Sequence, residues 1–451
     1  MNLLARLRAG QLAGAQRLSL SCGLTEFPRE IFELADTLEV LDLSSNALST
    51  LPPDIGRLHR MRVLFCSNNR FTELPASLGQ CGTLDTMGFK ANRIASVPAA
   101  SLPPSLRWLI LTDNRIETLP PTLGQCAGMQ KLMLAGNRLQ ALPDELAACR
   151  SLELLRIAAN RFDALPAWLM TLPRLSWLGY GGNPMSEACE AHIAAEASIP
   201  NIDWHALSIE HKLGEGASGV IHQAQWRRDD GSTQPVAVKL FKGAVTSDGW
   251  PHSEMAACIA ADAHPNLVAV LGRVAGHPDG SEGLVLHRID KTFGNLAAPP
   301  SLVSCTRDVY ADDAGWSVDV ALRLARGIAS AAGQLHARGI LHGDLYGHNI
   351  LWNGKGDGLL GDFGAASFLP QGDALQAQAQ ALQRIEVRAF GCLLEELLAG
   401  CRAAHADKTR IAALTELQAR CMQADVAARP LLAEVAASLD AAGALPVATT
   451  Q

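Results

Sequence analysis

The stretch LEVLDLSSNALSTLP, residues 38–52, determines how the N-terminal part of the chain folds, because its pattern recurs at an almost constant period. Its asparagine is the first of seven that follow one another in steps of 23, 23, 22, 23, 23 and 23 residues. They are Asn46, Asn69, Asn92, Asn114, Asn137, Asn160 and Asn183. A degenerate copy, RLSLSCGLTEFP (17–28), precedes them, so residues 17–185 contain about eight units.

Each unit places a few residue types where a short strand and a turn need them. Leucines at alternate positions, such as Leu41 and Leu43, point inward from a strand. The asparagine enters the turn and bonds main-chain groups that would otherwise be buried without partners. One unit cannot bury its own apolar face, so the units stack into a curved solenoid. This pattern resembles the leucine-rich repeat family, and the resemblance implies a stack of such units.

The concave strand face of such a solenoid is the surface that, by this resemblance, binds an unidentified protein. Several positions expected to face solvent there are aromatic or large and apolar, which a solvated strand face does not need. Scattered surface apolar residues, which are common, are the alternative explanation. The expected face consists of Glu39, Asp42, Arg62, Phe65, Asp85, Phe89, Arg107, Trp108, Ile110, Gln130, Met133, Arg156, Trp177 and Tyr180.

The pattern changes completely after residue 204. LSIEHKLGEGASGVIHQAQW (207–226) predicts a strand, a glycine turn and a second strand, whereas a Rossmann fold would continue into a helix. Further motifs follow in order: PVAVKLF (235–241) with Lys239, HSEMAACIAADA (252–263) with Glu254, HPNLVAVLG (264–272), LHARGILHGDLYGHNILW (335–352) with Asp344 and Asn349, GDFG (361–364) with Asp362, and DVAARP (425–430). This ordered set resembles the eukaryotic-type protein kinase family over about residues 207–440.

The resemblance implies a bilobal domain with ATP as substrate and Mg²⁺ or Mn²⁺ as cofactor. Lys239 would bind the α- and β-phosphates, Glu254 would hold that lysine, and Asp344 would accept or orient the proton of the attacking hydroxyl. Asn349 and Asp362 would bind the metal. The other residues assigned to ATP binding are Gly214, Gly216, Ala217, Ser218, Gly219, Ile221, Ala237, Leu286, His287, Ile289 and Leu351.

The chain departs from the family pattern around its catalytic loop. Gly343 stands where the family usually has an arginine that pairs with a phosphorylated activation loop, and Ser367 is the only hydroxyl residue within 364–384. Activity is therefore expected not to depend on phosphorylation of that loop. Tyr346 and His348 occupy positions where kinases carry a helper lysine or arginine, and a protonated His348 is predicted to replace that cation in part.

A second departure concerns the peptide-docking platform. No Ala-Pro-Glu motif lies between Asp362 and Glu386, which stands where the family has an aspartate before its next core helix, expected at 386–398. Arg429, the family partner of the missing glutamate, is expected to find another acid or to remain solvated. An ATP site is accordingly a firmer inference than a protein substrate.

The whole pattern indicates a multidomain α/β and α+β chain in which a leucine-rich-repeat solenoid precedes a bilobal kinase-like domain. The favoured function is an ATP-dependent protein kinase, with Ser/Thr specificity as the commonest case for this architecture. A pseudokinase or nucleotide-binding scaffold, and a kinase of small molecules, are the alternatives. The expected boundaries are a cap helix at 1–16, repeats at 17–185, a C-terminal cap and linker at 186–204, the kinase-like domain at 205–445 and a tail at 446–451.

Composition limits the other classes of function. The 451 residues carry a net charge of −7, which disfavours nucleic acid and anionic membranes as partners. No apolar run reaches the ~18 residues that span a bilayer. The eleven cysteines and the absence of a secretory signal pattern predict a cytoplasmic location. Delivery into a host cell by a specialised secretion route stays open, and the Ala- and Leu-rich composition is typical of a bacterial source.

Overall fold

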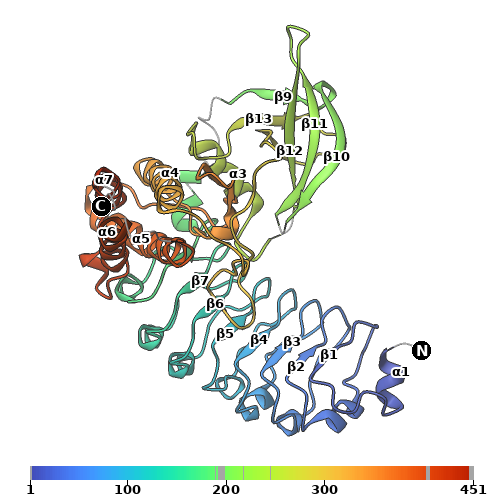
Figure 1. Cartoon of the computed structure of the whole chain (residues 1–451). Helices are drawn as coiled ribbons and strands as arrows, with labels where there is room; N and C mark the ends of the chain where they lie inside the picture. The colour runs from blue at the N-terminus through green and yellow to red at the C-terminus, as the bar shows by residue number, and fades with distance from the viewer. Residues whose placement is uncertain are drawn as a thin grey trace. The chain divides into compact units, whose positions relative to one another are not determined.

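The computed structural model describes residues 3–187, 189–190, 199–216, 218–243, 245–402 and 407–445. The chain forms two compact units, Met1–Leu172 and Pro173–Gln451 (Figure 1). Four parts of the sequence-based expectations lie outside the described residues: positions 1–2 of the cap helix, positions 188 and 191–198 of the C-terminal cap, Ala217, and the tail at 446–451. Among the described helices, none is both long enough and apolar enough to cross a membrane.

The first unit is a row of short parallel strands joined by 3-10 turns, preceded by helix α1 (Leu3–Arg8) (Figure 1). Its strands are β1 (Arg17–Ser19), β2 (Val40–Asp42), β3 (Val63–Phe65), β4 (Thr86–Gly88), β5 (Trp108–Ile110), β6 (Lys131–Met133) and β7 (Leu154–Arg156). Its turns are η1 (Arg29–Leu34), η2 (Ile55–Arg57), η3 (Ala76–Gln80), η4 (Ala99–Ser101), η5 (Pro121–Gln125), η6 (Asp144–Ala148) and η7 (Ala167–Thr171). Each strand pairs with the next in sequence order, as a repeat fold requires.

The asparagines act as the sequence predicts. The side-chain Nδ2 of Asn69 donates to the carbonyl oxygen of Leu43 at 2.9 Å, and its Oδ1 accepts from the amide of Leu48, also at 2.9 Å. Asn137 repeats this arrangement with Leu111 and Ile116. These bonds join neighbouring repeats and satisfy main-chain groups inside the turns.

Four positions assigned to the solvent-exposed strand face are in fact buried. Phe89 lies in the core against Phe71, because the register places Gly88, not Phe89, beside Phe65 on the strand face. Arg156 is buried as well. The other two are Trp177 and Tyr180, which belong to the second unit and are described below.

The second unit opens with strand β8 (Trp177–Gly179) and contains a six-stranded sheet. The sheet strands are β9 (Asn201–Asp203), β10 (Leu207–Glu215), β11 (Gly219–Arg227), β12 (Thr233–Phe241), β13 (Val270–Ala275) and β14 (Gly283–His287), in the order β10-β11-β12-β14-β13-β9. Alternate residues of β12, including Val236 and Val238, form the core of this lobe with Val285. Turn η8 (Trp204–Ala206) and helix α3 (Pro251–Ala260) complete it.

The remainder of the second unit is mainly helical (Figure 1). Its helices are α4 (Val318–Ala337), α5 (Gln376–Ala399), α6 (Lys408–Cys421) and α7 (Leu432–Ala444), with turns η9 (Gly347–Asn349), η10 (Asp373–Leu375) and η12 (Val426–Ala428). Small sheets join β15 (Gly294–Asn295), β17 (Ile350–Trp352) and β18 (Gly358–Leu360), and pair β16 (Ile340–Leu341) with β19 (Ser367–Phe368). Helix α5 begins at 376, before the expected 386, because the intervening residues are mostly Gln and Ala, which favour helix.

Candidate active site

A buried ion pair links the sheet lobe to helix α3. Strand β12 carries Lys239, whose ammonium group contacts the carboxylate of Glu254 on α3. Burial alone would lower the pKa of Lys239, but the negative charges of Glu254 and Asp362 outweigh it and raise that pKa. Lys239 is therefore a fixed positive charge, and Asp362 lies close enough to act on it.

The catalytic-loop residues are tied to each other and to the GDFG stretch. The Nδ2 of Asn349 donates to both the carbonyl oxygen and the Oδ2 of Asp344, each at 2.9 Å. The amide of Gly361 donates to the carbonyl oxygen of Asn349 at 3.0 Å, and His342 Nε2 lies 2.9 Å from the carbonyl oxygen of Gly361. These bonds bring Asp344, Asn349 and the residue preceding Asp362 into one site.

The donors in this site suit Mg²⁺ or Mn²⁺ bound together with phosphate. Because Asn349 uses its amide nitrogen on Asp344, its amide oxygen is the atom that can ligate a cation. Asp362 supplies a carboxylate directly after Gly361, whose amide donates to the carbonyl oxygen of Asn349. Within the described ranges, no group of three His, Cys, Asp or Glu side chains forms a metal cage. One or two protein ligands completed by phosphate oxygens and water are the usual arrangement for Mg²⁺.

The glycine turn and its neighbours lie along the same strands. Gly214 pairs in register with Ile221, and Ile221 pairs with Lys239. A side chain at Gly219 would lie 2.5 Å from the carbonyl oxygen of Leu240, so only glycine fits there. At Gly216 a side chain would meet open space.

The remaining predicted nucleotide contacts lie on three strands, in the glycine turn and in the connection to the helical lobe. Ala237 of β12 lies opposite Leu286 of β14, which ends at His287. Ile289 follows in the connection to the helical lobe, and Leu351 is half-buried on β17. Ser218 lies in the glycine turn, where its carbonyl oxygen accepts from the amide of Lys242 at 2.8 Å.

Asp308 is a site residue that no sequence motif indicated. Its Oδ1 lies 2.7 Å from Nδ1 of His348, and its Oδ2 accepts from the amide of His348 at 2.9 Å. Burial alone would lower the pKa of His348, but the hydrogen bond and charge of Asp308 outweigh it, and the net pKa is raised. The charges of Asp344 and Asp362 act in the same direction, so His348 lies near both acids.

The expectation for Arg429 is wrong. Its buried guanidinium donates to the main-chain carbonyl oxygens of Gln423 and Pro173, each at 2.8 Å, and of Arg384 at 3.2 Å. Burial lowers its pKa to about 10, with the charge of Arg388 acting in the same direction. Converging carbonyl oxygens thus replace the acid that the family pattern supplies.

Glu386 is buried behind the catalytic loop. Its Oε1 accepts from the amide of Gly343 at 2.6 Å, and its Oε2 lies 2.7 Å from Nε2 of His336. Burial raises the pKa of this carboxyl, but the hydrogen bond and charge of His336 outweigh that effect, so its pKa is lowered. Glu386 therefore holds Gly343 as a carboxylate.

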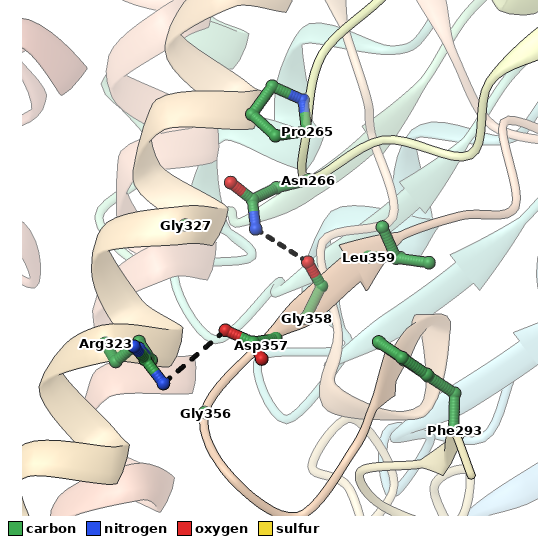
Figure 2. Close-up of a pocket in the computed structure, with 9 residues that line it drawn as sticks. All are labelled: Pro265, Asn266, Phe293, Arg323, Gly327, Gly356, Asp357, Gly358 and Leu359. Carbon is green, nitrogen blue, oxygen red and sulfur yellow. Dashed lines mark hydrogen bonds and ion pairs between the residues drawn. The ribbon is translucent and has the colours of Figure 1, made fainter. Parts of the chain in front are cut away.

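A separate pocket of about 430 Å³ lies between α4 and the turn that joins β17 to β18 (Figure 2). Asn266 and Gly358 both line this pocket, and Nδ2 of Asn266 donates to the carbonyl oxygen of Gly358 at 2.8 Å. Arg323 faces Asp357 across 3.7 Å at its edge. None of the predicted catalytic or metal-binding residues lines this pocket, so it is not part of the candidate active site.

Comparison with known families agrees with this geometry. Residues 207–399 match the family described as protein tyrosine and serine/threonine kinase. Residues 37–58 and 104–162 match leucine rich repeat families. The chain therefore contains leucine-rich repeats and a protein kinase domain, which confirms both resemblances. The comparisons do not support the bacterial source that the composition indicated.

Curated relatives resemble only part of the chain. The serine/threonine-protein kinase mos of Xenopus laevis is 26% identical over 195 residues, covering 43% of this chain and 51% of mos. Activated Cdc42 kinase Ack of Drosophila melanogaster is 29% identical over 216 residues, covering 44% of this chain and 18% of Ack. Tyrosine-protein kinase transforming protein RYK of avian retrovirus RPL30 is 38% identical over 77 residues, covering 16% of each chain. The chain thus spans about half of mos and less than a fifth of the other two.

Proposed function

We propose that this chain is an ATP-dependent protein kinase that transfers the γ-phosphoryl group to a serine or threonine hydroxyl. The observation that carries this proposal is that two sets of polar residues lie in one site. The buried Lys239–Glu254 pair forms the first, and the hydrogen-bonded Asp344 and Asn349 form the second. Asp362 connects the two: its charge acts on Lys239, and it directly follows Gly361, whose amide donates to the carbonyl oxygen of Asn349 at 3.0 Å.

The residue roles follow from this arrangement. Lys239, held by Glu254, neutralises charge on the α- and β-phosphates, and the glycine turn lets main-chain amides approach phosphate oxygens. Asp362 and Asn349 hold the divalent cation, Mg²⁺ or Mn²⁺, which neutralises charge developing on the transferred group. Asp344 orients the acceptor hydroxyl and takes its proton.

The Asp308–His348 pair supports an active kinase over a nucleotide-binding scaffold. Tyr346 cannot supply the positive charge that kinases place near the transferred phosphate, because it has no cationic group. The ring of His348, two residues further on, is held in one orientation by Oδ1 of Asp308, while Oδ2 of Asp308 accepts from the main-chain amide of His348. A scaffold would have no need of this second pair.

The repeats are proposed to recruit a protein partner. Four half-buried residues lie on strands β3, β5 and β6 of the first unit: Phe65, Trp108, Ile110 and Met133. The ammonium group of Lys131 lies 4.4 Å from the ring centre of Trp108. Aromatic residues beside a cation are typical of protein-binding surfaces. All eleven cysteines are free, which fits a reducing compartment such as the cytoplasm.

Transfer of label from radiolabelled ATP tests the proposal on the full chain, with Mg²⁺ and casein or myelin basic protein as acceptors. We expect Asp344→Asn to lower kcat by about 10²–10⁴-fold with unchanged nucleotide affinity. Asp357→Asn, a change of the same kind at an exposed turn, is the matched control and should keep wild-type turnover.

Absence of transfer to any protein, including the chain itself, would contradict the proposal. Nucleotide binding that is strengthened by Mg²⁺ without transfer would then indicate a scaffold. Transfer to small hydroxyl compounds alone would indicate a small-molecule kinase.

A further inference from the structure

The second unit begins inside the last repeat, at Pro173. Residues 173–190, here called the brace segment and described except for 188, lie against parts of the candidate active site. We propose that the brace segment is a built-in positioning element of the kinase site, with Trp177 and Tyr180 as positioning residues. This inference rests on the proposed function and assigns to the last repeat a role other than partner binding.

Trp177 holds the residues that directly follow Asp344. Its indole N–H donates to the carbonyl oxygen of Leu345 at 3.0 Å, and only 1% of the residue is exposed. Its ring stacks on Tyr346 with centroids 4.2 Å apart and planes 6° from parallel. A parallel stack and a directed hydrogen bond fix both the distance and the orientation of this part of the loop.

Tyr180 holds the strand that follows Asp362. Its amide donates to Oγ of Ser367 at 2.9 Å, and its hydroxyl donates to the carbonyl oxygen of Phe368 at 3.0 Å. Ser367 and Phe368 form β19, which pairs with β16 at the start of the catalytic loop. Tyr180 is 2% exposed and Ser367 is fully buried. The first residues of the activation segment therefore have a fixed anchor that needs no phosphate.

Glycines allow the brace segment to approach the catalytic loop and the activation segment this closely. Gly343 has φ +73°, and a side chain there would lie 2.7 Å from the carbonyl oxygen of Leu178 in the brace segment. A side chain at Gly181 would lie 2.8 Å from the carbonyl oxygen of Ala366. The arginine that the family usually carries at 343 would not fit against Leu178.

The brace segment also reaches helix α3. The hydroxyl of Ser253 donates to Oε2 of Glu190 at 2.6 Å, and both residues are buried. The other carboxylate oxygen of Glu190 accepts from Ser186 and from the amide of Gly182, which fixes it within the segment. Ser253 directly precedes Glu254, so this contact holds the residue that pairs with Lys239.

These contacts join the catalytic loop, the activation segment and α3 through one short stretch of chain. Ser367, the only hydroxyl side chain within 364–384, is committed to the brace segment. The fold therefore supplies the anchor that phosphorylation supplies in other kinases. Trp177 and Tyr180 affect turnover by positioning the catalytic loop and the activation segment, without taking part in the reaction themselves.

The test compares the full chain with two conservative variants. Trp177→Phe keeps a stacking ring and loses the N–H, and Tyr180→Phe loses only the hydroxyl. Trp168→Phe is the matched control, because the half-buried Trp168 of the first unit also loses one indole bond, to Asp144 at 3.1 Å. The first measurement is amide hydrogen exchange in peptides covering 340–350 and 362–370. The second measurement is turnover per bound nucleotide, that is, kcat divided by the number of Mg–ATP molecules bound per chain.

We expect each brace variant to exchange about fivefold faster in those peptides, the effect of losing one hydrogen bond. Turnover per bound nucleotide should fall at least threefold with nucleotide affinity within twofold, and Trp168→Phe should change neither quantity. Exchange that is unchanged, or raised equally over the whole second unit, would overturn the inference. If the wild-type chain transfers no phosphate, the proposed function fails, and the exchange pattern still decides whether the brace segment positions the site.

Discussion

Gly343→Ala should destabilise the second unit much more than the same change at Gly339. Both glycines have left-handed backbone, with φ +73° and +74°, so alanine costs roughly 1 kcal/mol at each. At Gly339 the new side chain would meet only Nε2 of Gln371, at 3.8 Å. At Gly343 it would lie 2.5 Å from the carbonyl oxygen of Ala365 and 2.7 Å from that of Leu178.

The difference between the two variants isolates the cost of the contact. Relieving two contacts with backbone oxygens has the character of overpacking, which costs about 1–3 kcal/mol. We therefore expect a loss of about 2–4 kcal/mol for Gly343→Ala and about 1 kcal/mol for Gly339→Ala. Gly343→Arg, which restores the residue usual in the family, should lose at least as much as Gly343→Ala.

Urea unfolding of the full chain measures these values, with the transition of the second unit assigned by its shift on adding Mg–ATP. Turnover per bound nucleotide, measured on the same samples, should fall for Gly343→Ala and hold for Gly339→Ala. Losses of stability that agree within about 0.5 kcal/mol would refute the reasoning, because the backbone contacts at Gly343 would then add no cost.

Three further outcomes follow from the site. His348→Ala should lower kcat by about 10–10²-fold while nucleotide affinity, measured by calorimetry, stays within twofold, and Asp308→Asn should act in the same direction more weakly; an unchanged rate would exclude His348 as the helper cation. Phosphatase treatment of the purified chain should leave ATP turnover unchanged, because Ser367 is buried and bonded; a large loss would mean that another phosphate holds the site. Arg429→Ala should lower the free energy of unfolding in urea by about 3–5 kcal/mol, because it removes a buried donor from converging carbonyl oxygens. Arg429→Lys should recover only part of this loss. A loss under about 1 kcal/mol for Arg429→Ala would show that water replaces the guanidinium.

The features that could be predicted from sequence are those carried by short-range patterns. The constant asparagine spacing was enough to predict the bonds of Asn69 and Asn137, because each bond lies within one repeat or its neighbour. The kinase fold was predicted from the ordered set of motifs that runs from the glycine turn through Lys239, Asp344 and Asp362 to residues 425–430.

What could not be predicted depends on contacts between distant parts of the chain. Trp177 and Tyr180 were both expected on the strand face, but Tyr180 stands three residues before Asn183, the repeat position that Phe89 also fills with a buried side chain. The residues that cover Trp177 and Tyr180 lie more than 160 positions later, at Leu345 and Phe368. Phe89 was misplaced for a local reason, a shift of one residue in register, which exchanges the two faces of a strand. Asp308 lies in an irregular connection, where no periodic pattern marks a partner for His348.

The departures from the kinase pattern are not independent of one another, and this bears on whether the chain has lost activity. Decay would leave altered positions exposed or without partners. Here Gly343 makes room for the carbonyl oxygen of Leu178, Tyr346 stacks on Trp177, and Arg429 binds the carbonyl oxygen of Pro173. Two of the altered positions, Gly343 and Tyr346, thus contact the brace segment, and Arg429, which the family also carries, binds it in place of the missing glutamate. His348, the remaining departure in the catalytic loop, is held by Asp308. Altered positions that each have a fitted partner are what selection for a differently braced, working site would produce.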